Sequence, residues 1–536
     1  MRLDTLSTKA FTARTLIASR MLEATRPDHT LRRLLALNKW GPTPAGGYSA
    51  SAACNPDAIS IIDELGTLTF HEVNRRTNAL AHALSDAGIN EGDGVGIMCR
   101  NHRGFVEATV AASKLGAHAL FLNTAFAGPQ LTEVCEREGP AAIVYDEEFT
   151  ALLSGALEGR KRFLAWSDGN ADAVPTLEEL IAAGDRSDVV PPARKGRLVI
   201  LTSGTTGAPK GANRRQPESL DPIAGLLAKI PLRARERTLI AAPLFHSWGL
   251  AHLILGIGLS STLVLRRRFD PEDTLAALDE YGCTALVVVP VMLQRILELG
   301  PKVLGRYDTA ALRVIAASGS ALPGELATNV MDAFGDVLYN LYGSTEVAWA
   351  TIATPEDLRA APGTAGRPPR GTVVRLFDGA DREVAPGETG RIFVGSELAF
   401  EGYTGGGGKA AIEGLMSSGD VGHFDGDGRL FIDGRDDEMI VSGGENVFPR
   451  EVEDLVACLD GIDEVAMIGV PDEDFGQRLR GFVVVTPGAE VSEAEIKAHV
   501  KANLARFKVP REIVFLDELP RNATGKVLKR ELAKLP

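Results

Sequence analysis

A run of hydroxyl side chains, glycines and one lysine, LTSGTTGAPKGA at residues 201–212, has the composition of a phosphate-binding loop. Its hydroxyls can donate hydrogen bonds to anionic oxygens and its glycines let backbone N–H groups approach them, at Thr202, Ser203, Gly204, Thr205, Thr206 and Gly207. Lys210 adds a mobile positive charge, so the loop suits a polyphosphate. The loop contains no Gly-Lys-Ser/Thr triplet, and Pro209 disfavours a helix directly after it, so the spacing is not that of a P-loop kinase.

The heptapeptide NLYGSTE at residues 340–346 combines an aromatic ring, a glycine, two hydroxyls and a carboxylate. Tyr342 can stack on a base, Thr345 can reach the α-phosphate region, and Glu346 can hold Mg²⁺, which prefers oxygen ligands. We assign the other polar and small residues of this motif to the same nucleotide site: Asn340, Gly343 and Ser344.

Two shorter motifs fit the ribose and the base. The segment ASGSALP at 317–323 follows an expected strand, and its small residues would let a flat purine lie against the backbone at Ser318, Gly319 and Ser320. The segment SGDVG at 418–422 contains Asp420, whose carboxylate can accept hydrogen bonds from two ribose hydroxyls.

In this order the motifs resemble those of the acyl-adenylate-forming (AMP-binding) superfamily, which includes acyl-CoA synthetases, nonribosomal peptide adenylation domains and firefly luciferase. TSGTTGAPKG is similar to the family's phosphate-binding signature, YGSTE to its YGxTE element, and SGDVG to its TGD element. The resemblance extends from about Pro56 to Lys529, and within the superfamily we suspect the fatty acyl-CoA synthetase type.

The resemblance assigns roles to further residues. In IDGRDDEMIVSGGENVFPREVE at 432–453, Arg435 would reach the ribose or phosphate and Asp437 would be the hinge of a mobile domain. The Ser-Gly-Gly segment after the hinge would lie beside the pantetheine channel of coenzyme A, at Ser442, Gly443 and Gly444. Lys526, in LPRNATGKVLKREL, matches the catalytic lysine, and His246, in APLFH, would line the acyl pocket.

The reaction implied by the resemblance has two steps and uses ATP, Mg²⁺ and coenzyme A. A carboxylate attacks the α-phosphate of ATP to give acyl-AMP and pyrophosphate, and the acyl group then passes to the thiol of coenzyme A. Because residues 245–258 are largely apolar, we favour a medium- or long-chain fatty acid. The alternatives are an aryl- or other carboxylate-adenylating ligase that acts on coenzyme A or a carrier protein, and a non-catalytic acyl- or nucleotide-binding member.

The chain departs from the family pattern directly before Asp420. Ser418 replaces the usual threonine, and the preceding YTGGGGKAAIEGLMS lacks the longer Pro- and Trp-containing run of relatives. The local geometry ahead of Asp420 is therefore left open by the sequence.

Short apolar strands alternate with helical patterns from Ala58 onward, which predicts an α/β protein with helix-covered parallel sheets. Gly- and Pro-rich turns at about 363–434 indicate a β-rich lobe. We expect an amphipathic N-terminal extension (1–50), a large adenylate-forming domain (51–434) and a small mobile α+β domain (435–536).

Composition limits the remaining possibilities. The net charge of −14 argues against a nucleic-acid partner. The five cysteines form no CxxC pair and have no histidine at metal-ligand spacing in our reading, and the first residues lack a secretory pattern, so we expect reduced thiols in a cytoplasmic protein. The basic N-terminal helices either pack on the body or make peripheral contact with the inner face of the membrane. The oligomeric state is not readable.

Overall fold

The computed structural model describes residues 2–22, 26–169, 174–202, 210–214, 219–398, 400–404, 406, 408–436, 440–442, 445–447, 449–472, 476–504, 508–522 and 525–535. The chain divides into two compact units. Unit 1 comprises residues 1–317, 333–339 and 397–408, and unit 2 comprises residues 318–332, 340–396 and 409–536. The domain boundaries expected at residues 50 and 434 stay predictions.

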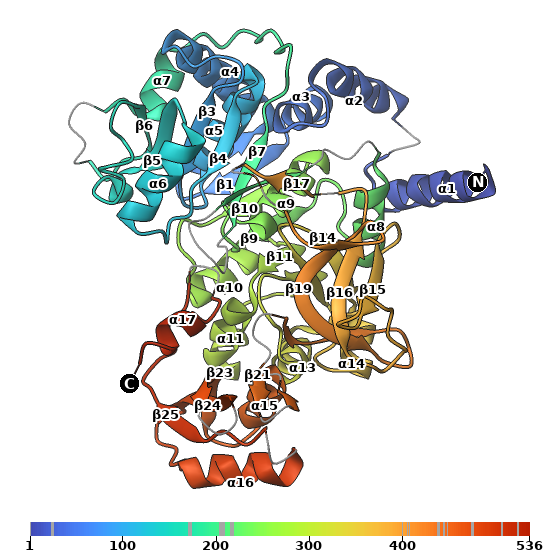
Figure 1. Cartoon of the computed structure of the whole chain (residues 1–536). Coiled ribbons are helices and arrows are strands. Elements are labelled where there is room, and N and C mark those ends of the chain that lie inside the picture. Colours follow the sequence, from blue (N-terminus) through green and yellow to red (C-terminus); the bar gives the residue numbers. More distant parts are fainter. Residues whose placement is uncertain are drawn as a thin grey trace. The chain divides into compact units, whose positions relative to one another are not determined.

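Unit 1 begins with three helices, α1 (Arg2–Ala18), α2 (Pro27–Trp40) and α3 (Pro44–Cys54) (Figure 1). Proline occupies the first turn of α2 and of α3, where its missing N–H leaves no hydrogen bond unmade. The side chain of Thr43 caps α3 by accepting a hydrogen bond from the backbone N–H of Gly46. The helical N-terminal region expected from the sequence is confirmed.

The first sheet of unit 1 has the strand order β17-β8-β7-β4-β3-β5-β6. Its five strands from β7 to β6 are parallel, whereas β8 and β17 are antiparallel to their neighbours. Its strands are β3 (Gly94–Met98), β4 (His118–Phe121), β5 (Ala142–Asp146), β6 (Lys161–Trp166), β7 (Leu198–Thr202), β8 (Lys210–Arg214) and β17 (Phe400–Tyr403). The helices in this part of the chain are α4 (Phe70–Asp86), α5 (Arg103–Leu115), α6 (Gly128–Glu138), η1 (Glu147–Phe149) and α7 (Leu177–Ala183).

The second sheet has eight strands, and its part in unit 1 has the order β2-β1-β10-β9-β11-β12, which is parallel except for the β1–β2 hairpin. Its strands are β1 (Ile59–Asp63), β2 (Gly66–Thr69), β9 (Arg237–Ile240), β10 (Thr262–Leu265), β11 (Ala285–Val288) and β12 (Val314–Ala317). The helices in this part of the chain are α8 (Asp221–Lys229), α9 (Ser247–Gly258), α10 (Pro271–Glu280), α11 (Pro290–Glu298) and α12 (Pro301–Leu304). The α/β fold class is thereby confirmed.

The uncharged stretch from residue 238 to 265 is a core segment, made of β9, α9 and β10. Most of its side chains are buried, because both strands lie inside the sheet and α9 packs against it. Among the described residues, no helix is both long enough and apolar enough to cross a membrane.

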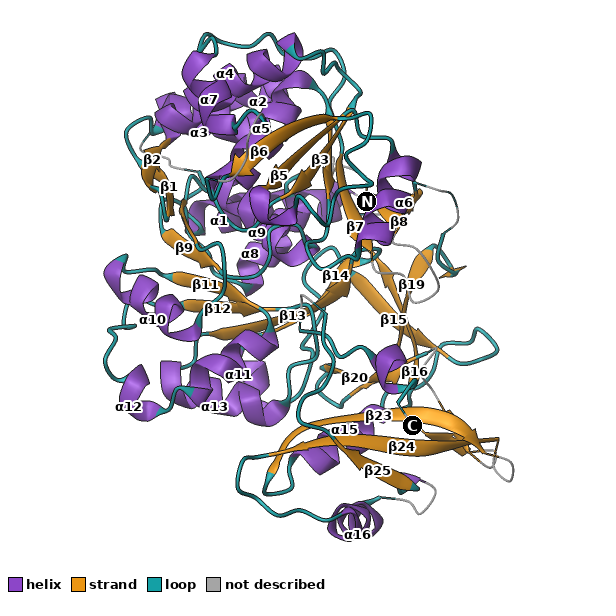
Figure 2. Cartoon of the chain, turned by 90° about the vertical axis from the view of Figure 1, so that its left-hand side faces the viewer, coloured by secondary structure: helices purple, strands orange, loops and turns teal. Residues whose placement is uncertain are grey.

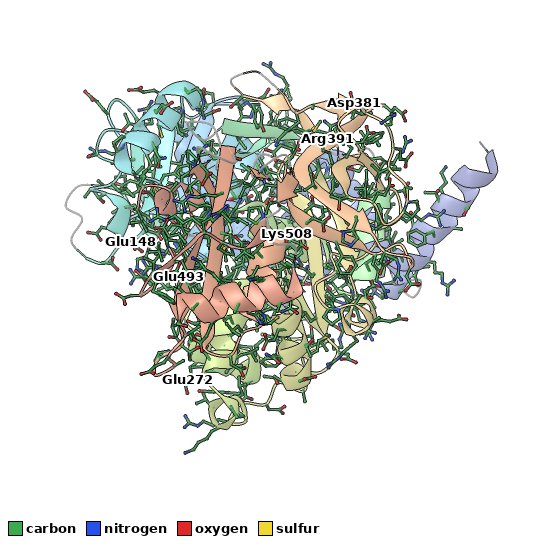
Figure 3. The ribbon with its side chains drawn as sticks, turned by 60° about the horizontal axis from the view of Figure 1, so that its bottom comes forward. Glu148, Glu272, Asp381, Arg391, Glu493 and Lys508 are labelled. Atoms are coloured by element: carbon green, nitrogen blue, oxygen red, sulfur yellow. The ribbon has the colours of Figure 1, made fainter. Side chains whose placement is uncertain are left out.

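Unit 2 contains a β-rich part and a C-terminal α+β part (Figure 2). The β-rich part has an antiparallel sheet in the order β15-β16-β19-β18, with β20 paired to β19. Its elements are β13 (Leu338–Ser344, which leads in from unit 1), β14 (Ala348–Ala353), α14 (Pro355–Ala360), β15 (Val373–Phe377), β16 (Gly390–Gly395), β18 (Ala411–Ile412), β19 (Leu415–Phe424) and β20 (Leu430–Arg435). Arg391 of β16 pairs with Asp381, in the turn after β15, at 2.6 Å (Figure 3). Helix α13 (Gly324–Phe334) begins in unit 2 and ends in unit 1.

The C-terminal part of unit 2 is a sheet with apolar side chains on both faces. Figure 2 shows its two long strands, β23 (Ile462–Asp472) and β24 (Gly476–Val485), side by side with β25 (Glu512–Phe515). Met467 and Val483 pack on one face, with α15 (Pro449–Ala457) and α16 (Glu493–Asn503), whereas Ala466 and Phe482 pack on the other, with α17 (Lys529–Leu532). Because both faces are covered, the strands read as continuous apolar runs. Strands β21 (Ile440–Ser442) and β22 (Glu445–Val447) complete the sheet.

Candidate active site

Three predicted site residues of unit 2 meet at one carboxylate. Asp420 of β19 and Arg435 of β20 are register partners in the antiparallel pair. The guanidinium of Arg435 donates to Oδ1 of Asp420 at 3.1 Å, and the hydroxyl of Tyr342 donates to its Oδ2 at 2.6 Å. We call these three residues the Asp420 cluster. A carboxylate has about four acceptor positions, so the two hydrogen bonds leave room for two ribose hydroxyls.

The charge of the Asp420 cluster depends on its burial. Burial raises the pKa of Asp420, while the positive charges of Arg435 and Lys526 and the hydrogen bond from Tyr342 oppose that rise. Burial, together with the neighbouring Asp420 carboxylate, raises the pKa of Tyr342 well above its usual value, so its hydroxyl remains a donor. Because its charge acts on Asp420, Lys526 lies near the cluster in this unit.

The contacts of Ser418 show the local geometry ahead of Asp420, which the sequence left open. Its hydroxyl donates to the backbone carbonyl of Ile392 on β16 and accepts from the backbone N–H of Asp420, both at 3.1 Å. The side chain is buried, with 2% of its surface exposed. The serine therefore supplies the hydroxyl that a threonine would supply, and it fixes the backbone from which Asp420 projects.

Lys409 is a site residue that sequence reasoning missed. Gly419 adopts a φ of +84°, and a Cβ built there would lie 3.3 Å from both Nη2 of Arg435 and Nζ of Lys409. Lys409 is therefore a third cation beside the Asp420 cluster, after Arg435 and Lys526. It stands in the Gly-rich run that departs from the family pattern, so no motif pointed to it.

The turn after β13 holds the predicted Mg²⁺ ligand. The hydroxyl of Ser344 donates to Oε2 of Glu346 at 2.9 Å and accepts from the backbone N–H of Glu346 at 3.2 Å. A Cβ at Gly343 would lie 1.9 Å from the carbonyl oxygen of Ala348, so only glycine fits. Ala348 itself has a φ of +61°, which is strained for a residue with a side chain. This tight hairpin orients the carboxylate of Glu346.

Asn340 offers an unused acceptor in unit 2. Its side chain is 8% exposed, and its Oδ1 has no hydrogen-bond partner among the described residues. A buried amide oxygen without a donor is costly, and the exocyclic amine of adenine would satisfy it. Ser318 is also buried, while Ser320 is partly exposed and Gly319 has a φ of +98°.

Lys526 lies in a turn that fixes its backbone and leaves its side chain exposed. The side-chain oxygen of Asn522 accepts from the backbone N–H of Lys526, and the backbone N–H of Asn522 donates to the carbonyl of Lys526, both at 2.9 Å. Arg521 donates to the carbonyl of Gly525 at 2.5 Å. The turn therefore holds the lysine backbone while its ammonium can reach an anion.

The phosphate loop belongs to unit 1 and is described only at its ends. Thr202, the last residue of β7, is the register partner of Lys210, the first residue of β8, so the loop joins two antiparallel strands and not a strand and a helix. The remaining loop residues, Ser203, Gly204, Thr205, Thr206 and Gly207, lie outside the described residues, as do Asp437, Gly443 and Gly444. The backbone of Ser442 pairs with Glu445 and Gly476 at the edge of the C-terminal sheet.

His246 immediately precedes α9 in unit 1. Burial lowers the pKa of His246 to about 4, so the imidazole is neutral at neutral pH. Its Nε2 is buried and makes no hydrogen bond to any described residue, while its ring contacts Phe245 at 4.6 Å between centroids. A neutral, unpartnered imidazole in an apolar setting fits the predicted position against an acyl group.

Asn101 positions the segment that carries His246. Its Nδ2 donates to the carbonyls of Ile240 and Ala242 at 3.1 and 3.0 Å, and its Oδ1 accepts from the N–H of Leu244 at 2.9 Å. Asn101 is buried, so these bonds are shielded from water. The sequence gave no signal for this contact, because Asn101 and its partners lie about 140 residues apart.

The expectation that no cysteine lies at metal-ligand spacing from a histidine is wrong for Cys99 and His102. Contrary to our reading of the cysteines, their side chains lie close together with Asp146, and all three are buried. Nδ1 of His102 accepts from the N–H of Gly104 at 3.1 Å, so Nε2 carries the proton and donates to Asp146 at 2.8 Å. Both ring nitrogens are thus engaged in holding the start of α5, which is a structural role.

The residues described here fit a magnesium nucleotide. Glu346 supplies a carboxylate of the kind Mg²⁺ prefers, and Asn340 supplies an unpartnered acceptor for a base. Around Asp420 the cations Arg435, Lys409 and Lys526 outnumber the one carboxylate, which favours an added anion such as a phosphate.

Comparisons with known proteins agree with this chemistry. The family model of the AMP-binding enzyme matches residues 48–404, and that of the AMP-binding enzyme C-terminal domain matches residues 451–526. A feruloyl-CoA synthase of Amycolatopsis sp is 32% identical over 488 residues, which are 90% of this chain and 97% of that protein. A fatty acid–[acyl-carrier-protein] ligase, ScoC, of Streptomyces coeruleorubidus is 29% identical over 504 residues, 90% of this chain and 94% of that protein.

A solved structure extends the similarity. The o-succinylbenzoate CoA synthetase MenE from Bacillus subtilis, in complex with the acyl-adenylate intermediate OSB-AMP, matches with a TM-score of 0.81 and 26% identity. The match covers 91% of this chain and 98% of that one.

Tyr342→Phe tests the Asp420 cluster. It keeps the ring and removes the hydroxyl that donates to Asp420, so we expect the KM for ATP in ATP–pyrophosphate exchange to rise about 5-fold, which corresponds to about 1 kcal/mol. The hydrogen bond from Tyr342 lowers the pKa of Asp420, so its loss shifts the acid limb of the pH profile to higher pH. Tyr339→Phe in the same strand is the control. An unchanged KM and pH profile would show that the cluster does not contact ATP.

Lys409→Ala tests the third cation. We expect the KM for ATP to rise about 3-fold at low salt, with a smaller effect at high salt because exposed charges are screened. Lys302→Ala, an exposed lysine on α12, serves as the control. Equal KM values for Lys409→Ala and the unsubstituted protein would exclude Lys409 from the nucleotide site.

Proposed function

The chain belongs to the AMP-binding enzyme family, and we propose that it activates an apolar carboxylic acid as acyl-AMP and transfers the acyl group to coenzyme A. The observation that carries this proposal is the Asp420 cluster with Lys526 nearby, since it combines acceptors for a nucleoside with cations for a reacting phosphate. The likeness to a feruloyl-CoA synthase over 90% of the chain supports the same type of reaction.

In the first step the residues of this chain position the two substrates and stabilise charge. Asp420 would bind the ribose, with Tyr342 and Arg435 keeping its carboxylate ionised and oriented. Glu346 would hold Mg²⁺, which neutralises negative charge on the phosphates when bound. Lys526 would contact the carboxylate and the α-phosphate, where negative charge moves as the new P–O bond forms and pyrophosphate leaves.

The second step needs a different residue at the reacting centre. As in the family that the chain resembles, we infer that residues after Asp437 rotate, which withdraws Lys526 and brings Ser442, Gly443 and Gly444 toward the pantetheine of coenzyme A. The thiol then attacks the acyl carbonyl, and AMP leaves as a good leaving group. The roles of these residues in the second step stay predictions.

Two classes of acid are compatible with an apolar pocket. The sequence favoured a medium- or long-chain fatty acid, and the buried side chains of Trp248, Leu250 and Leu253 on α9 support an apolar wall. The similarity to a feruloyl-CoA synthase favours an aryl acid as the second candidate. The similarity to a fatty acid–[acyl-carrier-protein] ligase makes a carrier protein the alternative acceptor. Peripheral membrane contact through residues 1–50 is a separate proposal, and it does not depend on the residues of the candidate active site.

A panel of acids tests the substrate. ATP–pyrophosphate exchange is measured with fatty acids of graded length, hydroxycinnamates, succinylbenzoate and amino acids. We expect stimulation by acids with an apolar body and none by amino acids. Stimulation by aryl acids alone would replace the fatty acid with the second candidate. ATP binding without acyl-AMP from any acid would establish a non-catalytic member.

Lys526→Ala tests the two-step assignment. We expect adenylation to fall by about 100-fold or more, because the ammonium stabilises the charge that moves in that step. Conversion of supplied acyl-AMP and coenzyme A to thioester should persist. Lys534→Ala, an exposed lysine near the C-terminus, is the matched control. An equal loss of both half-reactions would refute the alternation of domains.

A further inference from the structure

Helix α2 exposes three leucines along one side. Leu31, Leu34 and Leu35 are 59%, 59% and 60% exposed, and their i, i+3, i+4 spacing puts them on one helical face. We call these residues the leucine face. A contiguous exposed apolar stripe of this kind marks an interaction surface more often than scattered apolar side chains do.

The opposite side of α2 is anchored to unit 1, so the leucine face has a fixed orientation. Trp40 is buried, and Arg33 donates to the hydroxyl of Ser260 at 3.3 Å. Arg32 donates to the carbonyl of Ala53, at the end of α3, at 2.9 Å. Helix α2 therefore already uses one side for packing on the protein, and the leucine face is the side left over.

The N-terminal region that contains the leucine face has a net charge opposite to that of the rest of the chain. Residues 1–40 contain eight Lys or Arg and three Asp or Glu, a net charge of +5. The whole chain carries −14, so residues 41–536 carry −19. On α2 itself, Arg32 and Lys39 are exposed beside the leucines, and Arg26 pairs with Asp28 at 3.1 Å at its start.

We propose that α2 binds the surface of an anionic lipid bilayer, with the leucine face inserted among the headgroups and Lys39 facing lipid phosphates. A basic helix with an apolar face binds such surfaces by burying apolar area and by electrostatic attraction. The acidic remainder of the chain is repelled by the same surface, which orients the protein with α2 toward it.

The charge disfavours a second copy of the chain as the occupant of this face. In a two-fold dimer the same patch faces itself, so two copies of the basic helix α2 would be brought together. An anionic bilayer meets the same charge with attraction. If the proposed function holds, this contact places the enzyme where apolar acids partition.

Co-sedimentation of the full chain with vesicles tests the proposal. The vesicles are phosphatidylcholine alone, or phosphatidylcholine mixed with phosphatidylglycerol. We expect binding to the mixed vesicles that weakens with salt, and little binding to the neutral ones. The double variant Leu31→Gln with Leu34→Gln has the same charge as the unsubstituted protein, and it should bind the mixed vesicles at least about 10-fold more weakly.

The control is a double variant at exposed apolar residues away from α2, Leu65→Gln with Val190→Gln, which should bind like the unsubstituted protein. ATP–pyrophosphate exchange should be unchanged in both double variants and verifies that they fold. The single variant Leu35→Gln provides the same test if the Leu31 and Leu34 variant does not fold.

Three results would overturn the proposal. The first is no binding of the unsubstituted protein to mixed vesicles at low salt. The second is equal binding by the leucine variants and the control. The third is a dimer in sedimentation velocity that the leucine variants convert to monomer, since a second copy would then cover the face. Failure of the acid panel would leave these vesicle results unaffected.

Discussion

Unit 2 depends on the buried carboxylate of Asp420 and on the donors that surround it. Desolvation of a carboxylate is unfavourable, and burial does raise the pKa of Asp420. Tyr342 and Arg435 offset that cost with two hydrogen bonds from two other strands. The bonds tie β13, β19 and β20 together, so the interaction at the centre of the candidate nucleotide site also links the strands that carry it.

The same carboxylate organises the positive charge of the site. Lys409 lies beside Gly419, the positive charge of Lys526 acts on Asp420, and neither lysine has a salt-bridge partner among the described residues. The backbone of Lys526 is held by hydrogen bonds with Asn522. An excess of cations around one carboxylate is unfavourable in the free protein and favourable once a phosphate is bound.

Unit 1 uses buried amides and ion pairs to place its loops. Asn101 holds the backbone ahead of His246. The next residue, His102, bonds to Asp146 and holds the start of α5. Of these two neighbouring residues after β3, Asn101 connects the two sheets of this unit, whereas His102 links β3 to β5 within one sheet. The leucine face of α2 lies apart from these contacts and has a different physical basis, since it combines unburied apolar area with a local reversal of charge.

Much of the fold was predictable from the sequence because its signals are local. The strands Leu198–Thr202, Thr262–Leu265 and Val314–Ala317 are short apolar runs of the kind that the sequence predicted, and α5 ends before Gly116, which adopts the left-handed conformation that glycine favours. The residue types of Tyr342, Glu346, Asp420, Arg435 and Lys526 likewise identified adenylate chemistry before any contact was known. The sequence therefore determined the fold class and the family, and it predicted the residues that would carry the chemistry. Only the tertiary structure decided which donors Asp420 has, that Lys409 lies beside Gly419, that Asn101 holds the segment before His246, and that the leucines of α2 stay exposed. Those outcomes depend on strand register and on packing between segments up to about 140 residues apart, which no local pattern encodes.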